Sequence, residues 1–74
     1  MVYDYSKLIG KIIEVCGTRM KFAKRMNMSE RTLSLKLNNK IAWKQSEMQK
    51  ASEILGFDVS EMQAYFFTLK VQAS

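Results

Sequence analysis

The side chains in this chain that could do chemistry are basic residues gathered in one short stretch. Residues 18–44, here called the basic segment, hold eight of the twelve lysines and arginines and one of the seven acids, Glu30, a net charge of +7. The other residues carry four basic and six acidic groups, a net charge of −2. A basic patch confined to one segment is typical of a surface that contacts a phosphate backbone. This charge pattern favours duplex DNA as the partner.

The sequence offers little for catalysis or for a bound cofactor. It has no histidine, no glycine-rich phosphate loop and no base placed near Cys16, so the usual acid–base and nucleophilic arrangements are absent. A single cysteine forms no intramolecular disulfide, and a Cys/His zinc set cannot be assembled. We therefore expect a protein that is not an enzyme and that has no cofactor, no metal and no small-molecule ligand.

Length and composition predict one small helical domain covering residues 1–74. A domain of this size buries only about 60% of its unfolded surface, which leaves little room for a deep active site. The chain is 47% apolar, with no proline and three glycines, which suits a helical bundle. No apolar run approaches the ~18 residues of a membrane span, and no signal peptide is evident. We expect a soluble, intracellular protein without membrane contact.

Apolar spacing and capping residues predict an all-α fold, a compact five-helix bundle with a central helix-turn-helix. Asp4, Thr18 and Ser29 can cap the first three helices, and the pairs Ser46/Gln49 and Ser60/Gln63 match capping boxes for the last two. Apolar residues at helical spacing predict the buried face of the first helix: Leu8, Ile9, Ile12, Ile13 and Cys16. The expected helices span 5–16, 19–26, 30–38, 45–55 and 61–66.

The second and third helices have the spacing of a helix-turn-helix. Phe22 followed by the small Ala23 allows a close approach of the next helix, and Asn27 tolerates the positive φ that the turn requires. The matching positions are Phe22, Ala23, Met26, Asn27, Met28 and Leu33. The alternative interpretation is a structural helical hairpin with solvated lysines.

At these positions the chain resembles the Cro/repressor-type helix-turn-helix family of phage and bacterial regulators. The likeness is carried by Ala-Lys-Arg-Met-Asn-Met-Ser at 23–29, by Thr-Leu-Ser at 32–34 and by the stretch 51–62, and it covers about residues 5–66. The small size resembles a phage Cro-like repressor. The resemblance implies sequence-specific binding of duplex DNA.

Three positions depart from the pattern of that family. Asn27 replaces the usual glycine, and Arg19 stands where many members have a phosphate-binding glutamine. The second apolar anchor of the recognition helix is Leu37, one residue later than usual, and Lys36 stands in the usual place. The last departure leaves the rotation of this helix in the groove open.

The resemblance implies that helix 30–38 reads base edges in the major groove. Arg31 is the foremost candidate, because a guanidinium pairs with guanine O6 and N7. Glu30 either accepts a hydrogen bond from a cytosine amino group or stabilises the helix N-terminus. The expected base-reading residues are Ser29, Glu30, Arg31, Ser34 and Leu35. The expected phosphate contacts are Thr18, Arg19, Lys21, Lys36, Asn38, Lys40 and Lys44.

The C-terminal stretch 65–71 is too apolar for a solvated tail, and its second half alternates like a short strand or extended tail. It either caps the core or joins two subunits. We favour the interface, because a repressor of this type reads a palindromic operator as a homodimer. The expected interface residues are Tyr65, Phe66, Phe67, Leu69 and Val71.

The leading hypothesis is thus a transcriptional regulator that binds duplex DNA, a phage repressor or Cro-like protein. The alternative is a protein-interaction module such as an antirepressor with the same fold, because a helix-turn-helix does not by itself establish DNA readout. RNA binding ranks third. The basic segment offers no exposed aromatic for base stacking apart from Trp43, for which core packing is favoured.

Overall fold

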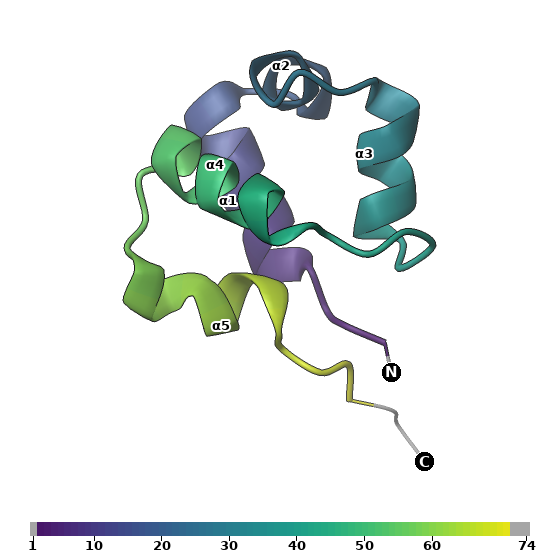
Figure 1. Cartoon of the computed structure of the whole chain (residues 1–74), viewed down its shortest axis with the longest axis vertical. Coiled ribbons are helices and arrows are strands. Elements are labelled where there is room, and N and C mark those ends of the chain that lie inside the picture. Colours follow the sequence, from purple (N-terminus) through teal and green to yellow (C-terminus); the bar gives the residue numbers. More distant parts are fainter. Residues whose placement is uncertain (1, 72–74) are drawn as a thin grey trace.

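The computed structural model describes residues 2–71 and confirms the all-α, five-helix fold (Figure 1). Its elements are α1 Ser6–Cys16, α2 Arg19–Arg25, α3 Glu30–Leu37, α4 Gln45–Leu55, the 3₁₀ turn η1 Val59–Glu61 and α5 Met62–Phe66. Figure 1 shows α2 at one end of the molecule, and α5 with the two terminal segments toward the other. Within the described residues, no helix combines the length and the apolar composition needed to cross a bilayer.

The N-terminal half forms its helices where the sequence predicts them. The Thr18 hydroxyl accepts from Lys21 N at 3.1 Å, and the Ser29 hydroxyl accepts from Thr32 N at 3.0 Å, so each satisfies a free amide at the start of its helix. Asn27 adopts φ 59° in the turn between α2 and α3. These local signals define the helix-turn-helix and explain why its boundaries follow from the sequence.

The first helix differs from the prediction at both its cap and its buried face. Asp4 accepts from Ser6 N at 2.8 Å, although Tyr5 and not Asp4 occupies the N-cap position. Leu8 and Ile12 are fully buried, but Ile13 is 46% exposed and does not belong to the core. The expected core face was too wide, because the helices that pack on α1 leave the side with Ile13 open to solvent.

Both expected capping boxes were wrong by two residues. Lys44 N donates to the Glu47 carboxylate at 2.8 Å and opens α4 at Gln45. Asp58 N donates to the Glu61 carboxylate at 3.0 Å and opens the turn η1 ahead of α5. In both places a glutamate reaches back to the backbone amide three residues before it. A carboxylate is a stronger acceptor than the glutamine side chain on which the prediction relied.

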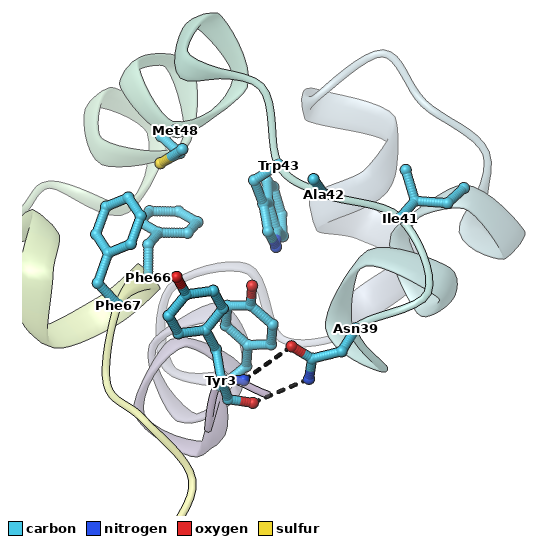
Figure 2. Close-up of a pocket in the computed structure, with 9 residues that line it drawn as sticks. Tyr3, Asn39, Ile41, Ala42, Trp43, Met48, Phe66 and Phe67 are labelled. Atoms are coloured by element: carbon cyan, nitrogen blue, oxygen red, sulfur yellow. Dashed lines mark hydrogen bonds between the residues drawn. The ribbon is translucent and has the colours of Figure 1, made fainter. Parts of the chain in front are cut away.

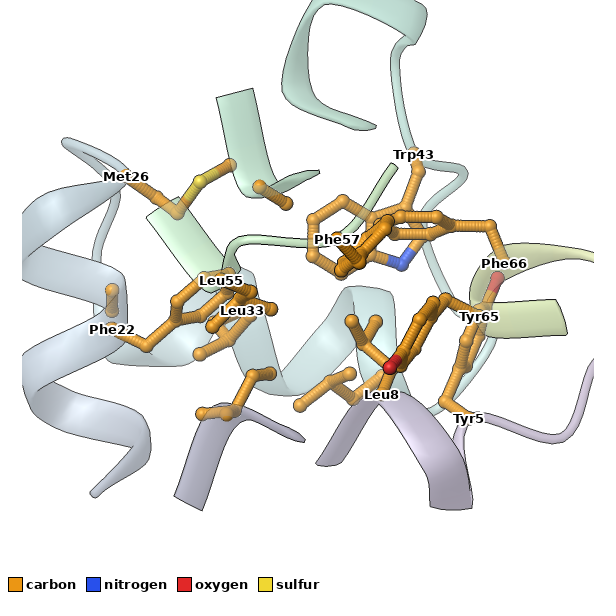
Figure 3. Packing of buried hydrophobic residues seen from close by; sticks show 14 residues of the cluster. Tyr5, Leu8, Phe22, Met26, Leu33, Trp43, Leu55, Phe57, Tyr65 and Phe66 are labelled. Atoms are coloured by element: carbon orange, nitrogen blue, oxygen red, sulfur yellow. The ribbon is translucent and has the colours of Figure 1, made fainter. Parts of the chain in front are cut away.

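One hydrophobic cluster lies among all the helices (Figure 3). Phe22, Leu8, Ile12 and Leu33 fill the part beneath the helix-turn-helix, and each is fully buried. Aromatic rings fill the other part: Phe57 stacks on Tyr65 with centroids 4.0 Å apart, and Trp43 meets Phe66 edge to face at 5.1 Å. A largely aliphatic core thus supports the helix-turn-helix, and an aromatic core supports the opposite end.

The terminal segments pair with each other beside α5. Tyr3 and Leu69 form an isolated antiparallel bridge, supported by Asp4 N donating to Thr68 O at 2.7 Å. On its other side the Tyr3 backbone is held by the Asn39 side chain, which accepts from Tyr3 N and donates to Tyr3 O, both at 2.9 Å. The N-terminal segment is therefore tied on one side to the C-terminal stretch and on the other to the loop after α3.

Candidate interaction surfaces

Most of the residues predicted to contact DNA lie on the surface of α2, α3 and the loops beside them. Ser29, Glu30 and Arg31 are exposed at the start of α3, while Ser34 and Leu35 are half-buried. The exposed candidates for phosphate contact are Thr18, Arg19, Lys21, Asn38, Lys40 and Lys44. The structure brings these side chains to the surface of one motif, which presents mostly positive charge.

Lys36 is an exception, and its predicted phosphate contact was wrong. It is only 3% exposed, and its ammonium lies 2.9 Å from the Glu47 carboxylate and 3.0 Å from the carbonyl oxygen of Ala42. The same ammonium lies 5.9 Å from the centre of the Trp43 ring. Lys36 therefore occupies the place of the missing apolar anchor, with its aliphatic stem in the core and its charge neutralised inside the protein.

The Lys36–Glu47 pair also sets the charge state of Glu47. Burial alone would raise the pKa of Glu47, but the hydrogen bond from Lys44 N, the hydrogen bond from Lys36 and the nearby positive charges hold it below its ordinary value. Glu47 is therefore a carboxylate at neutral pH, and it joins the end of α3 to the start of α4. The pair positions the loop that carries Ile41 and Trp43.

The predicted subunit interface divides into buried and exposed residues. Tyr65 and Phe66 are buried among the other aromatic rings of the same chain, so they cannot serve as an interface without unfolding α5. Phe67, Leu69 and Val71 are exposed. The prediction failed for the first two because α5 is amphipathic and turns this face inward, onto Phe57 and Trp43.

A second surface feature, which we call the aromatic pocket, has a volume of about 290 Å³ (Figure 2). Four parts of the chain build it: the N-terminal segment, the loop between α3 and α4, the first half of α4, and the end of α5. The residues that matter for its chemistry are Tyr3, Ile41, Trp43, Met48, Phe66 and Phe67. Ile41 and Phe67 are 43% and 42% exposed and lie at its rim, so apolar surface remains open to solvent there.

The sequence interpretation missed most of this pocket. Tyr3, Asn39 and Ile41 received no role in it. A usable signal was the pair of aromatic residues Tyr3 and Tyr5 at alternate positions, which is unusual for a solvated N-terminus. Periodicity alone does not reveal it, because the pocket is assembled from four separate parts of the chain.

Together, these features define a small helix-turn-helix protein with two kinds of exposed recognition surface, one basic and one aromatic. Residues 1–69 match the model of a protein family described as "Protein of unknown function (DUF739)", and the chain belongs to this family. The solution structure of the modulator of repression (MOR) of the temperate bacteriophage TP901-1 from Lactococcus lactis is similar to the chain. That match has a TM-score of 0.81 and 51% identity, covering 97% of each chain. No curated protein matches the sequence.

These comparisons overturn the leading hypothesis from the sequence. The chain belongs to the DUF739 family and not, as expected, to the Cro/repressor-type family, and its similar structure is that of a modulator of repression, not of a repressor. The expectations of a DNA-binding repressor and of a palindromic operator as partner were wrong. The helix-turn-helix spacing was correctly recognised. That spacing predicts how the two helices pack, but it does not determine what their exposed face binds.

Proposed function

We propose that this chain is a modulator of phage repression that acts by binding a repressor protein. The observation that carries the proposal is its 51% identity, over 97% of both chains, to the phage modulator of repression. About half of the residues are therefore identical in the two chains, and the fold is the same. A protein partner is thereby favoured over the operator DNA.

The surface chemistry supports a protein partner. The exposed Met20 on α2 and the half-buried Met28 and Leu35 lie within the basic segment, so its surface mixes apolar and charged groups. Methionine and arginine are enriched in protein–protein interfaces, and complementary charge raises the association rate. Arg19 and Arg31 are thus the strongest candidates in this segment for contacts with an acidic surface of the partner.

The proposed role requires no catalysis. Within residues 2–71 no three His, Cys, Asp or Glu side chains come together as a metal site. The chain would act stoichiometrically by occupying the repressor, in the cytoplasm of the bacterial host where the phage repressor works. Its action on transcription would then depend on the concentration ratio of the two proteins.

Size-exclusion chromatography with light scattering tests the proposal. The purified chain is mixed with the repressor protein of the same phage genome, and a complex with the summed mass is expected at low micromolar concentrations. The Arg31→Glu variant should form less complex, whereas Lys50→Glu, an equal charge change on α4, should not differ from the wild type. If no complex forms at tens of micromolar, the proposed function is wrong.

A further inference from the structure

The aromatic pocket has the size and composition of a docking site for side chains. Its volume of about 290 Å³ lies at the lower end of the range of roughly 300–1,000 Å³ that is typical of ligand pockets. It is bordered by the rings of Tyr3 and Phe67, which meet edge to face at 5.8 Å, and by the aliphatic Ile41. A space of this size with an apolar lining suits one or two large apolar side chains.

The pocket also contains an unsatisfied hydrogen-bond donor. Trp43 is 8% exposed, and its indole nitrogen has no hydrogen-bond partner among the residues that the structure describes. Buried tryptophan N–H groups usually find an acceptor, and each exception calls for an explanation. Figure 2 shows this nitrogen directed toward the side of the pocket where Tyr3 and Asn39 lie. Because the nitrogen is covered from solvent, an oxygen of an occupant would satisfy it once the neighbouring side chains move aside.

The charges around the pocket specify the kind of occupant. Lys40 and Lys44 are both exposed and flank the loop that carries Ile41 and Trp43. Glu47 is neutralised by its pair with Lys36. Asp4 keeps its negative charge, and the two exposed lysines outnumber it. The rim is therefore positive around an apolar floor. It attracts a segment that carries a large apolar side chain among acidic residues.

A second copy of this chain fits these charges poorly. Two copies that meet rim to rim bring Lys40 and Lys44 of both chains together, which are like charges. The exposed Leu69 of a second copy could enter the pocket only together with its neighbour Lys70, which adds another positive charge at the rim. A partner of opposite charge suits this rim better.

We propose that the aromatic pocket receives a large apolar side chain of the repressor, presented by an acidic segment that contacts Lys40 and Lys44. This inference rests on the proposed function and names the anchoring site for that partner. The pocket holds the apolar side chain, the Trp43 nitrogen donates to an oxygen of the same segment, and the lysines orient it.

Two variants with the same charge change test the assignment. Ile41→Glu places a carboxylate at the rim of the pocket, and Val59→Glu places one on η1, at a residue that is 63% exposed and does not line the pocket. Circular dichroism first establishes that both variants are folded. Calorimetric titration with the repressor should then show at least a tenfold weaker affinity for Ile41→Glu and less than a twofold change for Val59→Glu. Phe67→Ser, a second rim variant without added charge, should also weaken binding severalfold.

Peptides probe the chemistry of the occupant directly, because Trp43 is the sole tryptophan of the chain. A tryptophan-free decapeptide with one central phenylalanine among glutamates should shift the Trp43 fluorescence and compete with the repressor. The same peptide with lysines in place of glutamates, or alanine in place of phenylalanine, should do neither. Equal responses to all three peptides would contradict the proposed occupant.

The outcomes separate this inference from the function on which it rests. If the repressor binds the wild type and Ile41→Glu equally well, the pocket proposal is overturned and the proposed function stands. If the repressor does not bind the wild type, both are overturned. If sedimentation shows that the wild type self-associates and that Ile41→Glu alone abolishes this, a second copy occupies the pocket and the proposed occupant is wrong.

Discussion

The basic segment and the aromatic pocket offer a partner two different kinds of contact. The basic segment presents long, solvated side chains such as Arg31 and Lys40, whose charges act over several ångströms and are weakened by salt. The pocket presents rings and aliphatic groups held in place by the fold, and it acts only on contact. Charges on a flexible surface favour fast encounter, whereas a preformed apolar pocket favours slow release. We expect the two regions to control different steps of binding.

The largest effect should appear at the boundary between pocket and core. Phe66 is buried against Trp43 and Phe57, so Phe66→Ala should lower the free energy of unfolding by about 3–5 kcal/mol. Its neighbour Phe67 is 42% exposed, and Phe67→Ala should cost about 1 kcal/mol, in proportion to the smaller area that it buries. Chemical denaturation of both variants measures the difference. Equal losses would mean that the rim of the pocket is part of the core.

The buried ion pair that joins the two regions should give the next largest effect. Glu47→Leu leaves the Lys36 ammonium buried without its carboxylate. We expect the free energy of unfolding to fall by about 2 kcal/mol. Breaking a fully buried pair costs roughly 3–5 kcal/mol, but the Glu47 side chain is 21% exposed, so this loss is smaller. The double variant Lys36→Met/Glu47→Leu should recover much of the loss. If it is less stable than Glu47→Leu alone, the two side chains are not coupled as the geometry indicates.

The same pair predicts how stability depends on pH. Because the pKa of Glu47 is lowered on folding, its contribution is complete above the ordinary value of 4.5 and is lost as the pH falls toward the folded value. The wild type should therefore lose more stability than Glu47→Gln as the pH falls below that value, since only the wild type must protonate this carboxylate. Thermal unfolding of both proteins across the acidic range measures the difference. Parallel pH profiles for the two proteins would contradict the assignment.

Sequence reasoning succeeded for the local signals of the helix-turn-helix and failed for features assembled at long range. The two capping boxes are local as well, and both were predicted two residues too late. Thr18, Asn27 and Ser29 act on residues within one helical turn, so their types and spacing were sufficient to predict the helix-turn-helix. The burial of Lys36 depends on Glu47, eleven positions away, and its charge alone suggested an exposed contact. The pocket depends on Tyr3 meeting Asn39 and Phe67, which no local pattern encodes. The partner was misjudged for a similar reason, because a positive surface can face either a phosphate or a carboxylate.

A smaller effect is expected at the clamp between the N-terminal segment and the pocket. Asn39→Ala removes both hydrogen bonds to the Tyr3 backbone and introduces a residue that tolerates φ 61° less well than asparagine does. We expect a loss of about 1–2 kcal/mol in global stability. Asn39→Gly keeps the backbone conformation and separates the two contributions. Hydrogen exchange should show faster exchange of the Tyr3 amide in both variants, and unchanged exchange would mean that the clamp does not hold this segment.

The smallest effect should come from single charges of the basic segment. Arg31→Ala should slow association with the repressor by about two- to fivefold and reduce its salt dependence, with little change in dissociation. Ile41→Glu should instead raise the dissociation rate. Stopped-flow kinetics at two ionic strengths separates these effects. If Arg31→Ala changes mainly the dissociation rate, the basic segment does not control association separately from the pocket, and the comparison is wrong.

The central claim, that this chain acts on a repressor protein and not on DNA, is tested most directly by fluorescence anisotropy of labelled operator DNA at physiological salt. Three samples are compared: the chain alone, the repressor alone, and the repressor titrated with the chain. We expect no site-specific signal from the chain alone, a strong signal from the repressor, and a change in repressor–operator binding that saturates at a defined ratio of chain to repressor. Site-specific binding of the chain alone to the operator, with repressor binding unaltered by the chain, would contradict the claim.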